Sequence, residues 1–104
     1  MTLLTESEIT AFLSTLPEWT LSEDKTSIST SIELTDFVAA LDLVNQVGHE
    51  AEQRNHHPDI DIRWNTVTLV QSSHSEGGLT RADLEMAQRI NDIAGIEREE
   101  DGSA

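Results

Sequence analysis

Two short stretches in which apolar and polar residues alternate constrain the fold of this chain more than any other feature. They are Ile28–Leu34 and Ile60–Trp64. A period of two is typical of strands that bury one face. Trp19–Leu21 precedes the first stretch across a polar, turn-like segment, and Val67–Leu69 follows the second across the pair Asn65-Thr66. The sequence therefore predicts two β-hairpins.

Two further segments begin with capping boxes, in which a Thr side chain and an acidic side chain three positions later bond backbone N–H groups at a helix start. The first box is Thr5–Glu8, and its apolar residues recur at helical spacing until Pro17. The second pairs Thr80 with Asp83, and its helix should continue to Ala94. These boxes predict a first and a last helix.

A third, longer helix is predicted between the two hairpins. Thr35 or Asp36 can serve as its N-cap. It should end near Arg54, because Pro58 cannot continue it. The stripe expected to face the core consists of Phe37, Leu41, Val44, Gly48 and Ala51, broadened by Ala40 and Val47.

The order of elements is therefore α-β-β-α-β-β-α. This order suggests an α+β fold, a four-stranded antiparallel sheet with three helices packed on one face. A chain of 104 residues is too short for two independent cores. We expect a single domain over residues 1–97 and a polar C-terminal tail over residues 98–104.

The charge balance is strongly acidic. Twenty acidic residues face six basic ones, for a formal net charge of −14. Such a surface repels phosphate backbones, which argues against nucleic acid as a partner. The periodic apolar residues argue against a disordered acidic chain. The remaining explanation is a folded protein of a halophile, in whose cytoplasm salt screens the self-repulsion.

Neither a membrane span nor a secretory leader is expected. No run reaches the roughly 20 apolar residues needed to cross a bilayer, and the first ten residues lack a basic, apolar segment. These features predict a soluble, cytoplasmic protein. The chain has no cysteine, so any acid–base or nucleophilic chemistry must come from His, carboxylates, Ser or Thr.

Three of the four histidines lie close to the second predicted hairpin. If Asn65-Thr66 form a two-residue turn, Trp64 lies opposite Val67. The same register, continued along both strands, places His57 opposite His74. The spacing alone therefore predicts two neighbouring imidazoles at one end of the hairpin.

His56 and Asp83 can join this pair. Strand alternation would point His56 to the other face, unless Pro58 releases the strand there, and Asp83 approaches if the loop over residues 72–78 turns back tightly. Imidazole titrates near neutrality, so neighbouring histidines can supply a base and an acid at the same pH. A carboxylate bonded to one ring nitrogen fixes the tautomer. Such a cluster suits removal of a proton from one atom while a hydroxyl leaves the next.

Simpler structural explanations exist for each of these residues. A His-His pair at a helix-to-strand junction is often a solvated turn. Asp83 fits a capping role at the helix start. Trp64 is in phase with Ile60, which favours core packing, and Glu52 is ordinarily a solvated residue late on a helix.

A zinc ion could in principle bind three imidazoles and a water molecule. However, His56 and His57 are adjacent, and adjacent ligands rarely converge on one metal. Their spacing to His74 also fits no familiar metal motif. We therefore predict no metal site.

At this point a known pattern is complete. The segment Glu52-Gln53-Arg54-Asn55-His56-His57-Pro58, followed by Trp64, His74 and Asp83, resembles the signature of the pterin-4a-carbinolamine dehydratases. That signature is an acidic or similar residue, three spacers, His-His-Pro, an aromatic residue, a His and finally an Asp. Every position is matched, and the resemblance covers nearly the whole chain. The composite is specific, although no single element is.

The resemblance implies the α+β fold described above and a hydro-lyase activity. The reaction is dehydration of a 4a-hydroxytetrahydropterin to the quinonoid dihydropterin, in tetrahydropterin recycling, with no metal or organic cofactor. The matching catalytic positions are His56, His57, His74 and Asp83, and the matching substrate-binding positions are Glu52 and Trp64. We expect His57 or His56 to take the N5 proton and His74 to assist the departing hydroxyl.

The resemblance also implies a homodimer or homotetramer. Animal members of the family additionally assist dimerisation of a transcription factor, a role that the acidic surface argues against here. Two alternatives stay open: the same fold acting on another pterin, for instance near molybdopterin synthesis, and an oligomeric interaction module without catalysis. Clustered titratable groups argue against the second, because a scaffold has no need of them.

Overall fold

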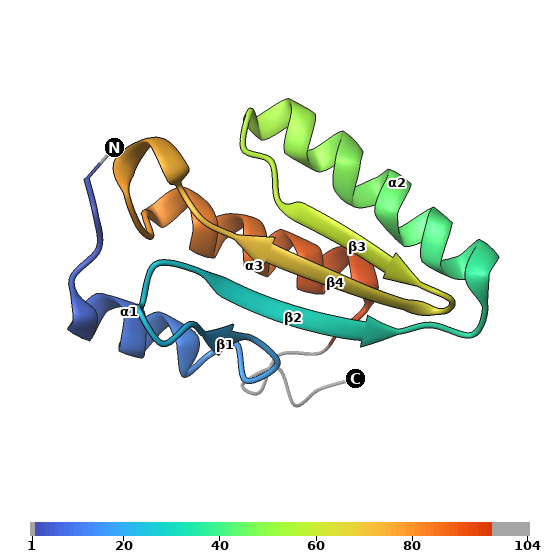
Figure 1. Cartoon of the computed structure of the whole chain (residues 1–104), viewed down its shortest axis with the longest axis horizontal. Helices are drawn as coiled ribbons and strands as arrows, with labels where there is room; N and C mark the ends of the chain where they lie inside the picture. Colours follow the sequence, from blue (N-terminus) through green and yellow to red (C-terminus); the bar gives the residue numbers. More distant parts are fainter. Residues whose placement is uncertain (1, 97–104) are drawn as a thin grey trace.

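A four-stranded antiparallel sheet and three α-helices form the fold, as predicted (Figure 1). The computed structural model describes residues 2–96. The elements are α1 (Glu6–Leu13), β1 (Thr20–Leu21), β2 (Ile28–Glu33), α2 (Phe37–Arg54), β3 (Asp59–Arg63), β4 (Thr66–Gln71), a short 3₁₀ turn η1 (His74–Glu76) and α3 (Arg81–Ala94). The predicted tail over residues 98–104, with its boundary, lies outside the described residues.

The strand order is β1-β2-β4-β3, so each hairpin contributes one inner and one edge strand. The first hairpin pairs β1 with β2, the second pairs β3 with β4, and β2 joins β4. Both inner strands alternate in burial. The buried positions lie opposite one another in the register: Ile28 faces Gln71, and Thr30 faces Leu69. One face of the sheet is therefore covered, and the other carries mainly polar side chains.

The helices cover the buried face. Ile9 from α1, Val47 from α2 and Ile90 from α3 belong to the same core cluster as Val67 and Leu69 of the sheet. Burial of an aliphatic side chain contributes about 1.5–3 kcal/mol, so this layer supplies most of the stability of a small domain.

No helix among residues 2–96 has the length and apolar content needed to cross a bilayer.

The predicted caps are confirmed. Thr5 and Glu8 form a complete capping box, and Asp36 accepts a bond from the backbone N–H of Ala39 at 2.9 Å. Thr80 and Asp83 form the second box. Each of these contacts spans three residues, which explains why the sequence alone could place them.

The core-facing stripe of α2 is rotated from the predicted one. Its buried residues are Ala40, Leu43, Val47 and Ala51. Phe37 and Leu41, which the sequence analysis placed inside, are 44% and 39% exposed. The helix turns its smaller residues toward the sheet, and this lets the two layers approach closely. The larger apolar residues of its first turns, Phe37 and Leu41, stay partly exposed among residues 2–96.

The hairpin between β3 and β4 has a different register from the predicted one. Ile62 lies opposite Val67, and the two turn residues are Trp64 and Asn65. Trp64 therefore does not continue the strand. Its φ is 55°, and its side chain is 67% exposed, so the predicted core packing of Trp64 is wrong. The predicted pairing of His57 with His74 across the strands fails for the same reason.

Candidate active site

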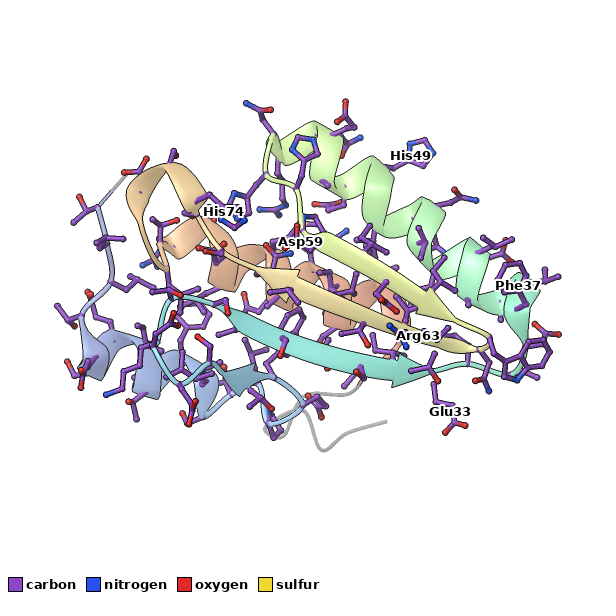
Figure 2. All side chains as sticks on the ribbon, in the orientation of Figure 1. Glu33, Phe37, His49, Asp59, Arg63 and His74 are labelled. Atoms are coloured by element: carbon purple, nitrogen blue, oxygen red, sulfur yellow. The ribbon has the colours of Figure 1, made fainter. Side chains whose placement is uncertain are left out.

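A pocket of about 370 Å³ lies where the end of α2 meets the connection from β4 to α3. It is lined by Asn55, His56, His57 and the run from Ser72 to Glu76. His74 lies at the end of the sheet opposite Phe37 and Arg63 (Figure 2). The pocket thus brings together the three histidines that the sequence singled out, although by another route than strand pairing.

The C-terminal cap of α2 positions the two adjacent histidines, His56 and His57. Asn55 takes a left-handed conformation with φ 52°, and the N–H of His56 bonds the carbonyl of Ala51 at 3.0 Å. Such a cap reverses the chain sharply at a helix end. Pro58 then starts the path into β3. Because of this reversal, His56 and His57 lie just after the C-terminus of α2 and before the first residue of β3.

His56 is held by Asp83. The distance from His56 Nε2 to Asp83 Oδ1 is 2.6 Å, and the His56 side chain is only 16% exposed. A carboxylate can only accept a hydrogen bond, so the network assigns the hydrogen to Nε2. Nδ1 of the same ring is then the nitrogen with a free lone pair. A ring fixed in this way can act as a base.

Asp83 is fully buried and satisfied on both oxygens. Its Oδ2 accepts the Thr80 backbone N–H at 2.9 Å and the Ser73 hydroxyl at 2.8 Å. Ser73 and Thr80 hydroxyls also lie 2.8 Å apart. Because buried charge is costly unless hydrogen-bonded, this network is what permits a carboxylate at the start of α3. Asp83 therefore caps the start of α3 with one oxygen and contacts His56 with the other.

A second histidine–carboxylate pair lies nearer the solvent. His57 Nε2 is 2.6 Å from Glu52 Oε2, with side chains 54% and 79% exposed. Exposed pairs of this kind contribute little to stability. The pair can still orient the His57 ring. His74 belongs to η1 and is exposed, and its ring bonds no side chain or backbone group among residues 2–96, so both ring nitrogens can contact a ligand.

Two residues considered in the sequence do not reach this pocket. Trp64 follows β3 at its other end, beyond Arg63 (Figure 2). His49 points outward from the middle of α2 (Figure 2). One copy of the chain thus collects Glu52, His56, His57, His74 and Asp83 and leaves Trp64 apart.

Sequence reasoning missed Ser73 as a partner of the site. Ser73 is 8% exposed and bonds Asp83 directly. Its only local signal is its position immediately before His74. That signal is weak, because Ser is common in loops for turn-forming reasons alone.

An ion-pair network joins the two helices that carry the site. Glu50 of α2 lies 2.6 Å from Arg54 and 3.2 Å from Arg89 of α3. Hydrogen bonds from Arg89 and then from Arg54 lower the pKa of Glu50. The same contact raises the pKa of Arg89. The network links α2 to α3, the two helices that the contact between His56 and Asp83 also joins.

A larger cavity of about 420 Å³ lies between α1 and α3, lined by Leu4, Phe12, Arg81 and their neighbours. It holds no histidine and no cluster of titratable groups. The histidine pocket is therefore the better candidate for chemistry.

Within residues 2–96, no three His, Asp or Glu side chains are arranged to hold a metal ion.

Comparison with known proteins gives a consistent picture. A protein of Nocardia farcinica named "Putative pterin-4-alpha-carbinolamine dehydratase" is 47% identical over 92 residues, which cover 88% of this chain and 95% of that protein. A crystal structure of a "transcriptional coactivator/pterin dehydratase" from Brucella melitensis superposes with a TM-score of 0.86 at 35% identity, covering 90% of this chain and 100% of that one.

A more distant structure shares the fold alone. It is a pterin dehydratase-like protein identified as a RuBisCO assembly factor in the alpha-carboxysome, with a TM-score of 0.67 at 15% identity, covering 77% of this chain and 93% of that one. The family model described as "Pterin 4 alpha carbinolamine dehydratase" matches residues 2–93. Together with the 47% identity of the relative from Nocardia, this match shows that the chain belongs to the pterin 4 alpha carbinolamine dehydratase family, whose named activity is that of a hydro-lyase.

Proposed function

We propose that the histidine pocket dehydrates a 4a-hydroxytetrahydropterin by general acid–base catalysis, in tetrahydropterin recycling. The observation that carries this proposal is the contact between His56 and the fully buried Asp83, in a pocket that His56 lines together with His57 and His74. Membership of the dehydratase family supplies the substrate class. The pocket supplies an oriented base and accessible acids, which is what the reaction needs.

The chemistry requires two proton transfers. A base takes the proton from N5 while the C4a–O bond breaks with its electron pair going to oxygen. The N5 electron pair forms the N5=C4a double bond of the quinonoid dihydropterin, and an acid protonates the departing hydroxide to water. Solvent then returns each histidine to its starting state, so one substrate yields one dihydropterin and one water.

We assign the base to His56, because Asp83 leaves its Nδ1 as the free acceptor. His74 is assigned as the acid, because it is an exposed residue that lines the same pocket as His56. His57, oriented by Glu52, then binds the substrate or relays a proton between the two. Asp83 acts through His56 and is a positioning residue. Glu52 bonds His57, which lines the pocket, and its exposed carboxylate can also accept hydrogen bonds from a pterin amino group.

The test is turnover of chemically generated 4a-hydroxytetrahydropterin in high salt. Wild type should accelerate dehydration over buffer, and His56→Ala and His74→Ala should each lower kcat by roughly 10²-fold or more. His49→Ala is the matched control, because His49 lies outside the pocket. No acceleration by wild type would refute the proposal. Loss of activity on adding a chelator would instead favour a zinc site.

A further inference from the structure

Ser73 lies between the two histidines to which the proposal above gives the proton transfers. It immediately precedes His74 in the chain, and it is only 8% exposed. Its hydroxyl lies 2.8 Å from the buried Asp83, the same carboxylate that holds His56. The family signature described above leaves this position open, so the contacts of Ser73 have to show what it does.

The hydroxyls of Thr80 and Ser73 form a chain of hydrogen bonds that ends on Asp83. A hydroxyl group has one hydrogen to donate and two lone pairs that can accept. Ser73 donates its hydrogen to Asp83 Oδ2 at 2.8 Å. The bond of 2.8 Å between the two hydroxyls therefore has Thr80 as its donor. Bonds in such a chain polarise one another, which strengthens the bond that reaches the carboxylate.

The order of the groups argues against Ser73 as a nucleophile. In a catalytic triad the histidine lies between the serine and the carboxylate, where it takes the hydroxyl proton. Here the carboxylate lies between, with Ser73 on Oδ2 and His56 on Oδ1 of Asp83. A hydroxyl that donates to a carboxylate keeps its proton, so the influence of Ser73 on His56 has to pass through Asp83.

Three donors fix the plane of the Asp83 carboxylate. Oδ2 accepts bonds from the Ser73 hydroxyl and the Thr80 backbone N–H, and Oδ1 accepts the bond from His56. Without the hydroxyl, one donor remains on each oxygen, and the carboxylate rotates more freely about its Cβ–Cγ bond. Oδ1 then moves away from the His56 ring. The Ser73 bond thus maintains the contact that leaves Nδ1 of His56 as the free acceptor.

The backbone of Ser73 also closes the loop that contains His74. Its N–H bonds the carbonyl of Gly78 at 2.9 Å, and its carbonyl accepts two N–H groups from the turn after His74, at 2.9 and 3.0 Å. The side-chain bond to Asp83 attaches this closed loop to the start of α3. One residue therefore sets the position of His74 relative to His56. Such geometry matters, because a displacement of about 1 Å can lower a rate by roughly 10²-fold.

We propose that Ser73 is a positioning residue of the dehydration. It acts through Asp83, keeps His56 in one tautomer and sets the separation between His56 and His74. The inference rests on the proposed dehydratase function, in which these two histidines are the base and the acid. It adds to the site a residue that the signature does not contain.

The kinetics of Ser73→Ala test this role. The variant should lower kcat roughly 10-fold and change KM less than about two-fold, because the Ser73 hydrogen is used on Asp83 rather than on the substrate. Ser73→Thr keeps the hydroxyl and should retain most of the wild-type kcat. Thr30→Val is the control, because Thr30 is also buried and loses a bond of 2.9 Å from its hydroxyl to the Glu18 carbonyl, outside the pocket. It should lower stability in urea unfolding and leave kcat unchanged.

A double-mutant cycle separates positioning from structural damage. Asp83→Ala removes the partner through which Ser73 acts. Adding Ser73→Ala to it should therefore slow the reaction by no more than about two-fold beyond Asp83→Ala alone. Losses of kcat that multiply would overturn the proposal. A wild-type kcat in Ser73→Ala, or an equal loss of kcat in Thr30→Val, would overturn it as well.

Nitrogen-15 spectra of the imidazole rings give a readout that is independent of turnover and of the cycle. At alkaline pH, where imidazole is neutral, the wild-type His56 ring should carry its hydrogen on Nε2 alone. In Ser73→Ala the ring should populate both tautomers, so the shifts of its two nitrogens should move toward each other. Unchanged shifts would contradict the proposal. A wild type without turnover would refute the dehydratase function instead, and the spectra alone would then decide whether Ser73 holds His56.

Discussion

Asp83 Oδ1 lies 2.6 Å from His56 Nε2, while the other oxygen of the same carboxylate caps the start of α3. A single buried side chain thus fixes a helix and a candidate catalytic ring together. The Ser73 hydroxyl completes the coordination of this carboxylate. The part of the candidate site formed by His56 and Asp83 is therefore continuous with the core, and its geometry depends on how α2 and α3 pack.

Asp83→Asn separates these two functions. The amide oxygen can still cap the helix, but the variant loses the charge that holds His56 in one tautomer. We expect kcat to fall by roughly 10²-fold with a small change in KM, and stability to fall by roughly 1–2 kcal/mol. Glu8→Gln, the equivalent change in the capping box of α1, should affect stability alone. Equal activity of Asp83→Asn and wild type would contradict the role of Asp83.

Glu50 should make stability depend on pH in the acid range. Arg89 and Arg54 lower its pKa in the folded state, so the folded protein binds its proton less readily than the unfolded chain does. The stabilising contribution is therefore present above the unfolded-state pKa and is lost as pH falls through the lower, folded-state pKa. Urea unfolding between pH 7 and pH 3 should show a smaller acid loss in Glu50→Gln than in wild type. Glu23→Gln, at an exposed turn, should behave as wild type.

Gln71 is a fully buried side chain whose amide nitrogen and oxygen have no hydrogen-bond partner among the described residues. It lies on the covered face of β4, in phase with Leu69. Leaving such groups unsatisfied costs roughly 1–3 kcal/mol. Gln71→Leu should therefore stabilise the protein by an amount in that range in urea unfolding, and Gln71→Glu should destabilise it. A less stable Gln71→Leu variant would indicate that the amide has a partner after all.

The net charge of −14 predicts a strong response to salt. Like charges on the surface repel one another, and ions screen that repulsion over about 10 Å at 0.1 M. The melting temperature should rise steeply with KCl. A variant in which several exposed acidic residues are changed to their amides should show a shallower rise. A flat response in wild type would count against adaptation to high salt.

Local patterns predicted much of the fold correctly. The capping boxes at Thr5 and Thr80 depend on contacts three residues apart, so the sequence was enough to place α1 and α3. Alternation placed β2 and β4. The rotation of α2 was missed because its helix offers apolar residues on a broad arc. Which part of that arc faces the sheet depends on packing against β4, and no local rule encodes that packing.

By itself, the sequence determined the order of elements, the helix starts, the histidine-rich signature and, through that signature, the family. The tertiary structure decided which two residues form the turn between β3 and β4. Two hydrogen bonds between Leu34 and Asn65, of 2.7 and 2.9 Å, tie that turn to the segment before α2. This long-range contact outweighs the local preference against Trp64 at positive φ. It moves the turn by one residue, shifts the partner of Val67 by two residues from Trp64 to Ile62, and leaves the indole exposed. The register of a strand pair depends on the sum of its contacts and not on its turn alone.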